Sequence, residues 1–284
     1  MEWVDRLNQA IDYLEEHLSE EISYEEAARA AGCSSYHFQR MFTYLAGTPL
    51  SEYIRRRRMS LAAVDLRSGD ERIIDIAMKY GYSSPTAFNR AFQSVHGVPP
   101  SAARRNGCPL KSYPPVRFKI IVKGAEEMEY RIEEKGPIRI VGISRPLRQN
   151  IEENFSTVPE MWGRAAADGT LPRLAAMMDG QPTGLLGVSA CGSGEQWRYF
   201  IAVASSAPAG EGLEAYVIPA CTWAVFPGSG TNLAIQELER RVVTEWLPTS
   251  GYEYANAPDV EVYLNPDPSN AQFEVWIPVV KSGK

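Results

Sequence analysis

The sequence predicts an all-α domain with two helix-turn-helix motifs, followed by an α+β domain built on an antiparallel sheet. Three observations lead to this fold class. The chain of 284 residues is nearly twice as long as a common single domain. One helical pattern occurs twice before residue 105. Beyond a segment rich in Pro and Gly, alternating strand patterns replace the helical ones.

The charge of the chain is unevenly distributed. The apolar fraction of 44% and the charged fraction of 23% exclude wholesale disorder and a collagen or membrane-span composition. A net charge of -6 by itself argues against a nucleic-acid partner, since phosphates attract Lys and Arg. Residues 1–27, however, carry -8, residues 28–107 carry +7, and residues 108–284 carry -5. A basic block therefore lies inside an acidic protein.

Several features predict a cytoplasmic protein without metal, cofactor or membrane segment. The chain begins Met-Glu-Trp, with neither the basic start nor the apolar core of a signal peptide. The longest apolar stretch, residues 216–226, contains Pro219 and is too short to span a bilayer. The four cysteines lie far apart and form no CxxC motif, so we expect reduced thiols.

The repeated helical pattern occupies residues 28–49 and residues 77–99. Each copy predicts a helix, a tight turn and a second helix. Gly32 and Gly81 stand where the chain must reverse, a position at which a positive φ favours glycine. Ser84 and its counterpart in the first copy are predicted N-caps of the second helices. The first domain therefore contains two helix-turn-helix motifs.

The second helix of each copy has one apolar stripe at helical spacing, which predicts its core face. Polar side chains remain on the other face, and such side chains can contact base edges and phosphates. One polar face is ordinary for a surface helix, but two copies in the same register inside the basic block favour DNA binding. The run of arginines from Arg55 to Arg58 is expected to contact phosphates and to support packing between the copies. The outward residues are predicted to be Tyr36, His37, Gln39, Arg40 and Thr43 in the first copy, and Thr86, Asn89, Arg90 and Gln93 in the second.

The doubled motif, Tyr53-Ile-Arg-Arg-Arg-Arg-Met-Ser60 and Gly97-Val-Pro-Pro-Ser101 resemble the AraC/XylS DNA-binding domain over about residues 4–105. The resemblance implies that both second helices enter adjacent major grooves, about 34 Å apart, of double-stranded DNA. It also implies an activator that contacts RNA polymerase. The residues that the resemblance places at bases or backbone are Tyr36, Gln39, Arg40, Thr86, Asn89 and Arg90.

The second domain follows a predicted linker. Residues 1–107 form the DNA-binding domain, residues 108–115 the linker, and residues 116–284 the second domain. Helical patterns near residues 159–167 and 232–247 each precede two strands. The order therefore predicts duplicated strand-helix-strand-strand units, with an antiparallel sheet and two helices on one face.

The last two strands alternate between apolar and polar residues. Glu261 and Tyr263 share one side of their strand, and Glu274 and Trp276 share one side of the next. We expect all four to lie on one face, extended by Phe200 if the duplication holds. Carboxylates among aromatic rings suit an apolar cation. The alternative for either carboxylate alone is an ordinary solvent-exposed sheet face.

The segment beginning Pro258-Asp-Val-Glu261 and the spacing of the two carboxylates resemble the GyrI-like ligand-binding domain over about residues 116–284. The resemblance implies a multidrug-sensor-like site for a small aromatic or cationic effector. It makes Glu261 the pocket carboxylate and Glu274 a second acid. The remaining expected ligand contacts are Tyr263, Trp276, Phe200 and Trp223 in the walls and Trp162 above the site from a helix.

Enzymatic motifs are largely absent, so no catalytic residues are expected. Gly187-Val-Ser189-Ala-Cys191 lacks the second glycine of a nucleophile elbow, and all three histidines lie in the first domain. The leading hypothesis is a ligand-responsive transcription regulator. One alternative is hydrolysis of strained electrophilic small molecules, with Glu261 or Glu274 as the base. Another is a constitutive DNA binder whose second domain docks protein partners.

Overall fold

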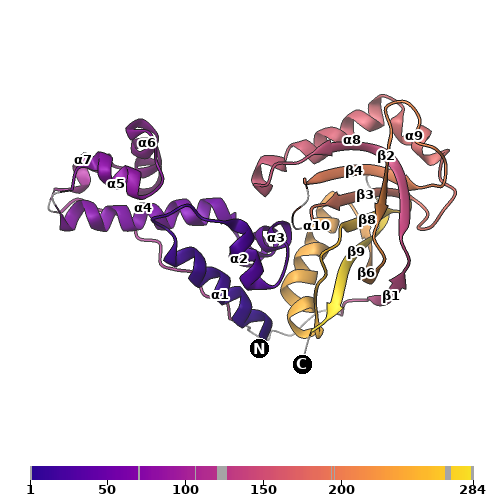
Figure 1. The fold of residues 1–284 in the computed structure, drawn as a ribbon, viewed down its shortest axis with the longest axis horizontal. Coiled ribbons are helices and arrows are strands. Elements are labelled where there is room, and N and C mark those ends of the chain that lie inside the picture. Colours follow the sequence, from indigo (N-terminus) through magenta and orange to yellow (C-terminus); the bar gives the residue numbers. More distant parts are fainter. Residues whose placement is uncertain are drawn as a thin grey trace. The chain divides into compact units, whose positions relative to one another are not determined.

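The computed structural model describes residues 2–282, except for residues 70, 106, 120–126, 193, 195 and 266–269. Its packing divides the chain into two compact units, each of which is described separately below. The helical unit contains residues 1–31 and 46–119, and the sheet unit contains residues 32–45 and 120–284. Figure 1 shows the helices of the first part of the chain and the sheet of the second.

The helical unit contains the second predicted helix-turn-helix copy and the first helix of the first copy. Ser84 caps the second helix of the second copy by accepting a hydrogen bond from the Ala87 amide, and Gly97 ends that helix with φ 78°. Gly81 has φ 82° in the preceding turn, as expected for glycine. The helices are α1 (Glu2–Glu16), α2 (Tyr24–Ala31), α4 (Leu50–Ser68), α5 (Ile73–Lys79), α6 (Pro85–His96) and α7 (Pro100–Ala103).

The arginines of α4 face inward more than the sequence suggested. Arg57 forms an ion pair with Glu15 of α1 at 2.6 Å and also donates to the Tyr113 carbonyl. Arg58 donates to the carbonyls of Leu18 and Glu20, and its guanidinium lies beside Gly81 in the turn of the second copy. These contacts show a packing role for Arg57 and Arg58, whereas Arg55 and Arg56 form ion pairs with Glu52 of the same helix. The guanidinium groups of Arg57 and Arg58 therefore bind other parts of the protein and are not available to phosphates.

The segment after α7 runs along the helical unit. Asn106, part of the predicted linker signal, lies outside the described residues. The backbone amides of Lys111 and Tyr113 donate to His96 and Ser60, respectively. Asn8 of α1 exchanges two hydrogen bonds with the backbone of Phe118. The predicted linker is therefore anchored, and the helical unit extends to residue 119.

The sheet unit has the predicted α+β architecture. Within the described residues its strands form one antiparallel sheet in the order β1-β6-β9-β8-β3-β4-β2-β5, with β7 beside β9. The strands are β1 (Arg131–Lys135), β2 (Ile138–Pro146), β3 (Leu185–Ala190), β4 (Arg198–Ala204), β5 (Glu214–Ile218), β6 (Cys221–Gly230), β7 (Tyr252–Tyr254), β8 (Asp259–Tyr263) and β9 (Ala271–Lys281). The helices are α3 (Ser35–Ala46), α8 (Thr157–Ala167), α9 (Thr170–Ala175) and α10 (Asn232–Arg241), the last continued by a π-helical turn over Val242–Trp246.

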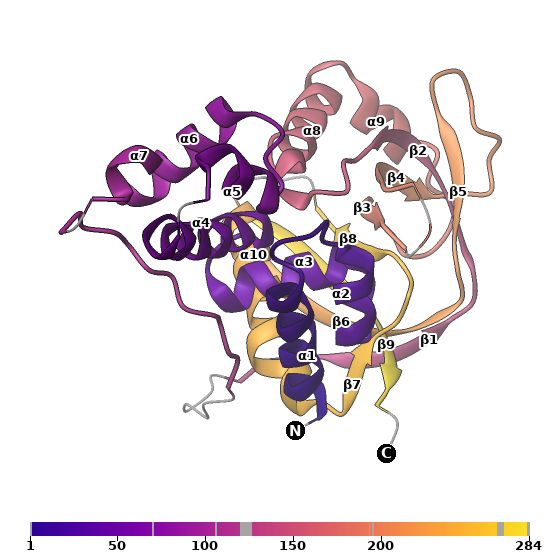
Figure 2. The same cartoon turned by 60° about the vertical axis from the view of Figure 1, so that its left-hand side comes forward.

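The sheet is duplicated, as predicted. The order β3-β4-β2-β5 on one side of its centre matches β8-β9-β6-β1 on the other, with β3 paired to β8. Val188 lies opposite Phe200 in the first half, and Val260 lies opposite Trp276 in the second. Phe200 and Trp276 therefore occupy corresponding positions. Figure 2 shows the strands of the two halves side by side.

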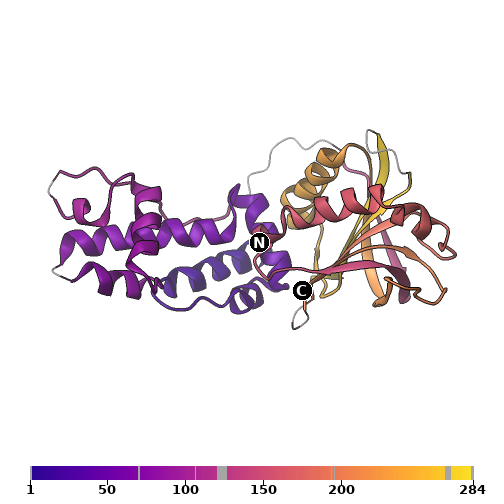
Figure 3. The ribbon, with the colours of Figure 1, turned by 90° about the horizontal axis from the view of Figure 1, so that it is seen from above.

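The two faces of the sheet differ. On one face α8 and α9 pack against Tyr199, Ile201 and Val203, and α10 packs on β6 and β9. Figure 3 shows α8 and α10 along the sheet. The other face carries a buried apolar cluster that includes Phe200 and Trp276. In the part of the chain that the structure describes, no helix is both long and apolar enough to cross a bilayer.

Candidate functional site

The centre of the candidate site is Glu261, in the middle of β8. Its partner on β3 is Gly187, which leaves space that the Glu261 carboxylate and the Tyr199 hydroxyl occupy. The hydroxyl of Tyr263 donates to Glu261 Oε2 at 2.9 Å, and that of Tyr199 donates to the same oxygen at 3.4 Å. Trp162 of α8 donates to Tyr199 Oη at 2.9 Å, and its ring lies 4.9 Å from the Tyr263 ring. Three aromatic side chains therefore position one carboxylate.

The Glu261 carboxyl resists ionisation. Burial raises its pKa to about 7, and the negative charge of Glu239 on α10 adds to the effect. The hydrogen bond from Tyr263 and the charge of Arg40 act in the opposite direction. Burial also raises the pKa of the Tyr199 phenol, which therefore remains a hydrogen-bond donor. A cation placed beside Glu261 would favour the ionised carboxylate.

A cavity of about 470 Å³ opens beside Glu261 within the sheet unit. Pockets of roughly 300 to 1,000 Å³ are typical of small-molecule sites. The lining comes from the sheet, from α3, α8 and α10, and from residues 147–155. The lining residues are Tyr36, Arg40, Thr43, Tyr44, Leu147, Ile151, Asn154, Phe155, Val158, Pro159, Ser189, Tyr199, Gln236, Glu239 and Glu261.

Helix α3 is the second helix of the first helix-turn-helix copy. Its polar side chains contact the sheet unit. The Tyr36 hydroxyl donates to Ser189 Oγ at 3.2 Å, and the Tyr36 ring meets the Trp197 ring edge-on at 5.3 Å. Gln39 donates to the Gln149 carbonyl at 2.8 Å and accepts from the Ile151 amide. These contacts explain why the packing places α3 with the sheet.

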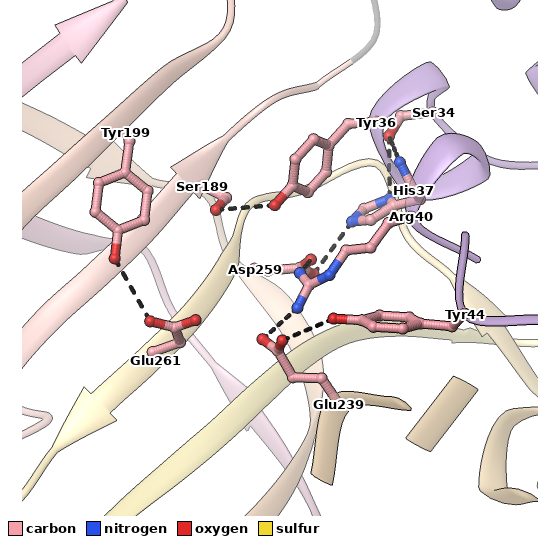
Figure 4. Close-up of polar contacts among 10 residues, drawn as sticks. All are labelled: Ser34, Tyr36, His37, Arg40, Tyr44, Ser189, Tyr199, Glu239, Asp259 and Glu261. Atoms are coloured by element: carbon pink, nitrogen blue, oxygen red, sulfur yellow. Dashed lines mark hydrogen bonds and ion pairs between the residues drawn. The ribbon is translucent and has the colours of Figure 1, made fainter. Parts of the chain in front are cut away.

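Arg40 and His37 form the charged centre of this contact (Figure 4). Arg40 is paired with Glu239 and with Asp259, the latter at 2.7 Å. His37 Nε2 lies 3.1 Å from the other Asp259 oxygen, and its ring stacks on Tyr254 with centroids 4.1 Å apart. Although burial would raise the pKa of Asp259, the charges and hydrogen bonds of His37 and Arg40 lower it. Asp259 is therefore an ionised carboxylate.

The structure separates the seven predicted DNA-contact residues into two groups. Thr86, Asn89 and Arg90 of α6 are exposed, as predicted. The first-copy residues were predicted to face outward, and that prediction is wrong for this structure. Tyr36, His37 and Gln39 are buried, and the Arg40 side chain is 11% exposed. The physical reason is that the sheet unit supplies a polar partner for each of these side chains.

The predicted shared face of the four sheet residues is also wrong. Because β8 and β9 are antiparallel with Glu261 opposite Val275, Glu274 and Trp276 point to the other face. Glu274 accepts from the Trp276 indole at 2.8 Å and pairs with Arg131 at 2.7 Å.

Phe200 and Trp223, two predicted wall residues, belong to the apolar cluster on that other face. The register of β4 places Tyr199, not Phe200, on the Glu261 face. Tyr263 bonds Glu261 and Trp162 bonds Tyr199, but neither is among the residues that line the cavity, so their ligand contacts stay predictions. Sequence reasoning missed Tyr199, Glu239 and Asp259. No cluster of three or more His, Cys, Asp or Glu suited to a metal ion occurs among the described residues.

Comparison with known protein families decides the class of the chain. Residues 128–280 match the GyrI-like small molecule binding domain, which is more than half of the chain. The chain belongs to the GyrI-like family. Residues 27–106 match a helix-turn-helix domain of the AraC type. This GyrI-like protein thus combines an AraC-type helix-turn-helix domain with a small-molecule binding domain.

Two curated relatives each match about a third of the chain. The transcriptional activator AarP of Providencia stuartii is 36% identical over 98 residues, which is 34% of this chain and 73% of AarP. The regulator YbfP of Bacillus subtilis is 40% identical over 98 residues, so the match spans only about a third of either protein (34% and 33%). A transcription regulation protein from Staphylococcus aureus MU50 covers 55% of this chain and 100% of its own, with 21% identity and a TM-score of 0.48.

Proposed function

We propose that this chain is a transcription activator whose affinity for DNA is set by a small aromatic cation bound beside Glu261. The single observation that carries the proposal is a carboxylate in a cavity with aromatic walls, held by Tyr199 and Tyr263. Aromatic rings offer a flat contact surface to an organic cation and attract it by cation–π interaction. The carboxylate supplies the countercharge. This combination favours multidrug-type sensing over recognition of one polar metabolite.

The proposed DNA contacts come from both repeats. On α6 the side chains of Thr86, Asn89 and Arg90 are exposed and free to meet base edges and phosphates. Gln39 and Arg40 hold the same positions in α3, so the repeat supports contact with two adjacent major grooves. AarP is a named activator, and its similarity to this chain supports activation of transcription. We further propose that the chain contacts RNA polymerase and acts in the cytoplasm.

The ligand half of the proposal is tested by calorimetric titration of the full chain with tetraphenylphosphonium, an aromatic monocation. We expect Glu261→Gln to weaken binding at pH 8 by at least tenfold, because the countercharge is lost and a neutral amide remains. Glu274→Gln is the matched control, since Glu274 lies on the opposite face of the sheet. Equal affinity of the wild-type and Glu261→Gln proteins would contradict a site beside Glu261.

The DNA half is tested with a duplex enriched from a random library by the wild-type full chain. Binding to this duplex should exceed binding to a scrambled duplex, and both affinities should fall as salt rises. Saturating tetraphenylphosphonium should change the affinity for the enriched duplex but should leave the salt dependence similar. An affinity independent of the cation would leave a constitutive DNA binder, the alternative in which the second domain docks protein partners.

A further inference from the structure

The face of α3 that would read DNA is occupied by the chain itself. Four candidate side chains each have a partner in the sheet unit. They are Tyr36, His37, Gln39 and Arg40. These partners are the Ser189 hydroxyl, the Asp259 and Glu239 carboxylates, and the backbone at residues 149–151. The same donors and acceptors cannot contact base edges or phosphates at the same time.

The burial of this contact shows that it is a closed interface. The side chains of Arg40, Glu239 and Asp259 are only 11%, 8% and 6% exposed. A duplex that approached this face of α3 would meet the sheet unit before it met the recognition side chains. DNA binding through α3 therefore requires that α3 first leave this surface.

Arg40 occupies the position of a bound cation. Its guanidinium faces two carboxylates and lies 5.9 Å from the centre of the Tyr36 ring and 5.8 Å from that of Tyr44. Carboxylates with aromatic rings are the surroundings that suit an organic cation. The side chain also forms part of the cavity wall that faces Glu261. Arg40 is thus an internal cation at the edge of the proposed ligand site.

We propose that the docking of α3 on the sheet unit through Arg40 and His37 inhibits DNA binding, and that an organic cation in the Glu261 cavity releases α3. The docking surface is formed by Ser189, Trp197, Glu239, Tyr254 and Asp259. The release step rests on the proposed function, whereas the inhibition by docking does not. Release reverses the inhibition because only the undocked state can bind DNA through α3.

A cation in the cavity affects docking because Arg40, Tyr44 and Glu239 both line the cavity and hold α3 in place. Glu239 pairs with Arg40 and also raises the pKa of Glu261 by its charge, so both carboxylates act on the same space. A second positive charge there repels the guanidinium and competes for its carboxylates. Tyr44 adds to the overlap, since it donates to Glu239 at 3.0 Å and lines the cavity. Ligand and docked α3 therefore compete for one set of groups.

The inhibition is tested without any ligand. Asp259→Asn removes a carboxylate that Arg40 and His37 share, and Asp259 is not a proposed DNA contact. Breaking one partner of a buried ion pair strongly disfavours the buried arrangement, so we expect the full chain to bind the enriched duplex at least about tenfold more tightly. Glu274→Gln, on the opposite face, should bind like the wild type.

Circular dichroism and melting temperature establish that each variant is folded. If Asp259→Asn does not fold, Glu239→Gln replaces it, because Glu239 is the other partner of Arg40. A folded variant that binds the duplex no more tightly than the wild type would overturn the inhibition. This arm contains no ligand, so its result is independent of whether the Glu261 site binds a cation.

Release is measured at Cys191, which is 3% exposed and packs against Tyr36 and Trp197. In the full chain, with modification located by peptide mass spectrometry, Cys191 should react slowly with a maleimide. Asp259→Asn, the enriched duplex and tetraphenylphosphonium should each speed the reaction at least severalfold. Under the same conditions Cys108, in the helical unit, serves as the internal control.

The two proposals fail in different ways. If tetraphenylphosphonium binds in a Glu261-dependent manner but leaves Cys191 protected or slows its reaction, the release step is overturned and the ligand site stands. If the cation does not bind while Asp259→Asn still tightens DNA binding, the ligand half of the proposed function fails and the inhibition stands. If neither the duplex nor Asp259→Asn speeds the slow maleimide reaction of Cys191, the docking itself is overturned.

Discussion

The state of Glu261 should control how cation binding depends on pH. Burial first, and the charge of Glu239 second, raise the pKa of this carboxyl to about 7. Only the ionised carboxylate attracts a cation. With a pKa of about 7, roughly one tenth of Glu261 is ionised at pH 6 and roughly nine tenths at pH 8. The affinity for a permanently charged ligand should therefore rise about tenfold between these pH values.

Arg40 from α3, Tyr199 from β4 and the neighbouring Tyr263 face Glu261 and keep their protons in this interval. Glu239 from α10 also faces Glu261. Although burial would lower the pKa of Arg40, the interactions with Glu239, Tyr44, Tyr36 and Asp259 together raise it. Burial raises the pKa of both phenols, so they remain protonated. The contribution of Glu239 is measured separately in Glu239→Gln.

The assay is calorimetric titration with tetraphenylphosphonium at pH 6, 7 and 8 in buffers of different ionisation enthalpy. Wild type should gain about tenfold in affinity and release about half a proton on binding at pH 7, because the bound cation holds Glu261 ionised. Glu261→Gln should bind weakly at all three values. Equal wild-type affinity at pH 6 and pH 8, or an unchanged slope in Glu261→Gln, would refute this account of the site.

Ionisation of Glu261 favours cation binding but lowers the stability of the ligand-free fold. Because the folded pKa of Glu261 lies above the ordinary value of 4.5, the stability that protonation contributes is complete below 4.5. It is lost as the pH rises through about 7. Without ligand, the melting temperature of Glu261→Gln should therefore exceed that of the wild type more at pH 8 than at pH 5.

Three further predictions concern other parts of the chain. Arg90→Ala should weaken binding to the enriched duplex and reduce the slope of log affinity against log salt by about one, while Arg67→Ala on α4 should bind like the wild type in the same filter assay. Arg57→Ala should lower the free energy of unfolding by about 3 kcal/mol in a urea titration, because it leaves a carboxylate of α1 without its ion pair. Gly187→Ala should abolish tetraphenylphosphonium binding, because the new Cβ would overlap the Tyr199 hydroxyl and lie 2.9 Å from Glu261 Oε2. Gly163→Ala, in which the new Cβ meets nothing within 4 Å, is the matched control for calorimetry, and retained affinity in the Gly187 variant would contradict a ligand site beside Glu261.

Local chemistry explains why most elements could be predicted. Ser84 accepts the predicted capping hydrogen bond, and Gly81 and Gly97 adopt the positive φ that their turns require. The run Leu185–Ala190 forms the buried strand β3, because a short apolar run that follows a glycine favours such a strand. These signals lie within a few residues of the structure they determine.

The faces of the strands depended on information that lies elsewhere in the chain. Alternation within β9 correctly places Glu274 beside Trp276, but the register with β8 decides which face they share. Because Glu261 lies opposite Val275 and not opposite Glu274, the side chains of Glu274 and Trp276 point away from the Glu261 face. In β4 both faces are buried, so the composition of that strand did not distinguish Tyr199 from Phe200.

The inward direction of α3 was unpredictable for a similar reason. Its apolar stripe was recognised correctly, with Phe38 and Phe42 fully buried. Two charged partners of its polar face lie far along the chain, since Glu239 is 195 residues from Tyr44 and Asp259 is 219 residues from Arg40. Polar side chains of a helix carry no local signal that distinguishes a DNA-facing surface from one that pairs with carboxylates.

The central claim is that cation binding at Glu261 and DNA binding are linked, and reciprocity tests it most directly. The affinity of the full chain for tetraphenylphosphonium should be measured with and without a saturating amount of the enriched duplex. Linkage requires that DNA raise the affinity for the cation by the same factor by which the cation raises the affinity for DNA. We predict equal factors above one in the wild type and a factor near one in Glu261→Gln. A wild-type affinity for the cation that DNA does not change would contradict the claim.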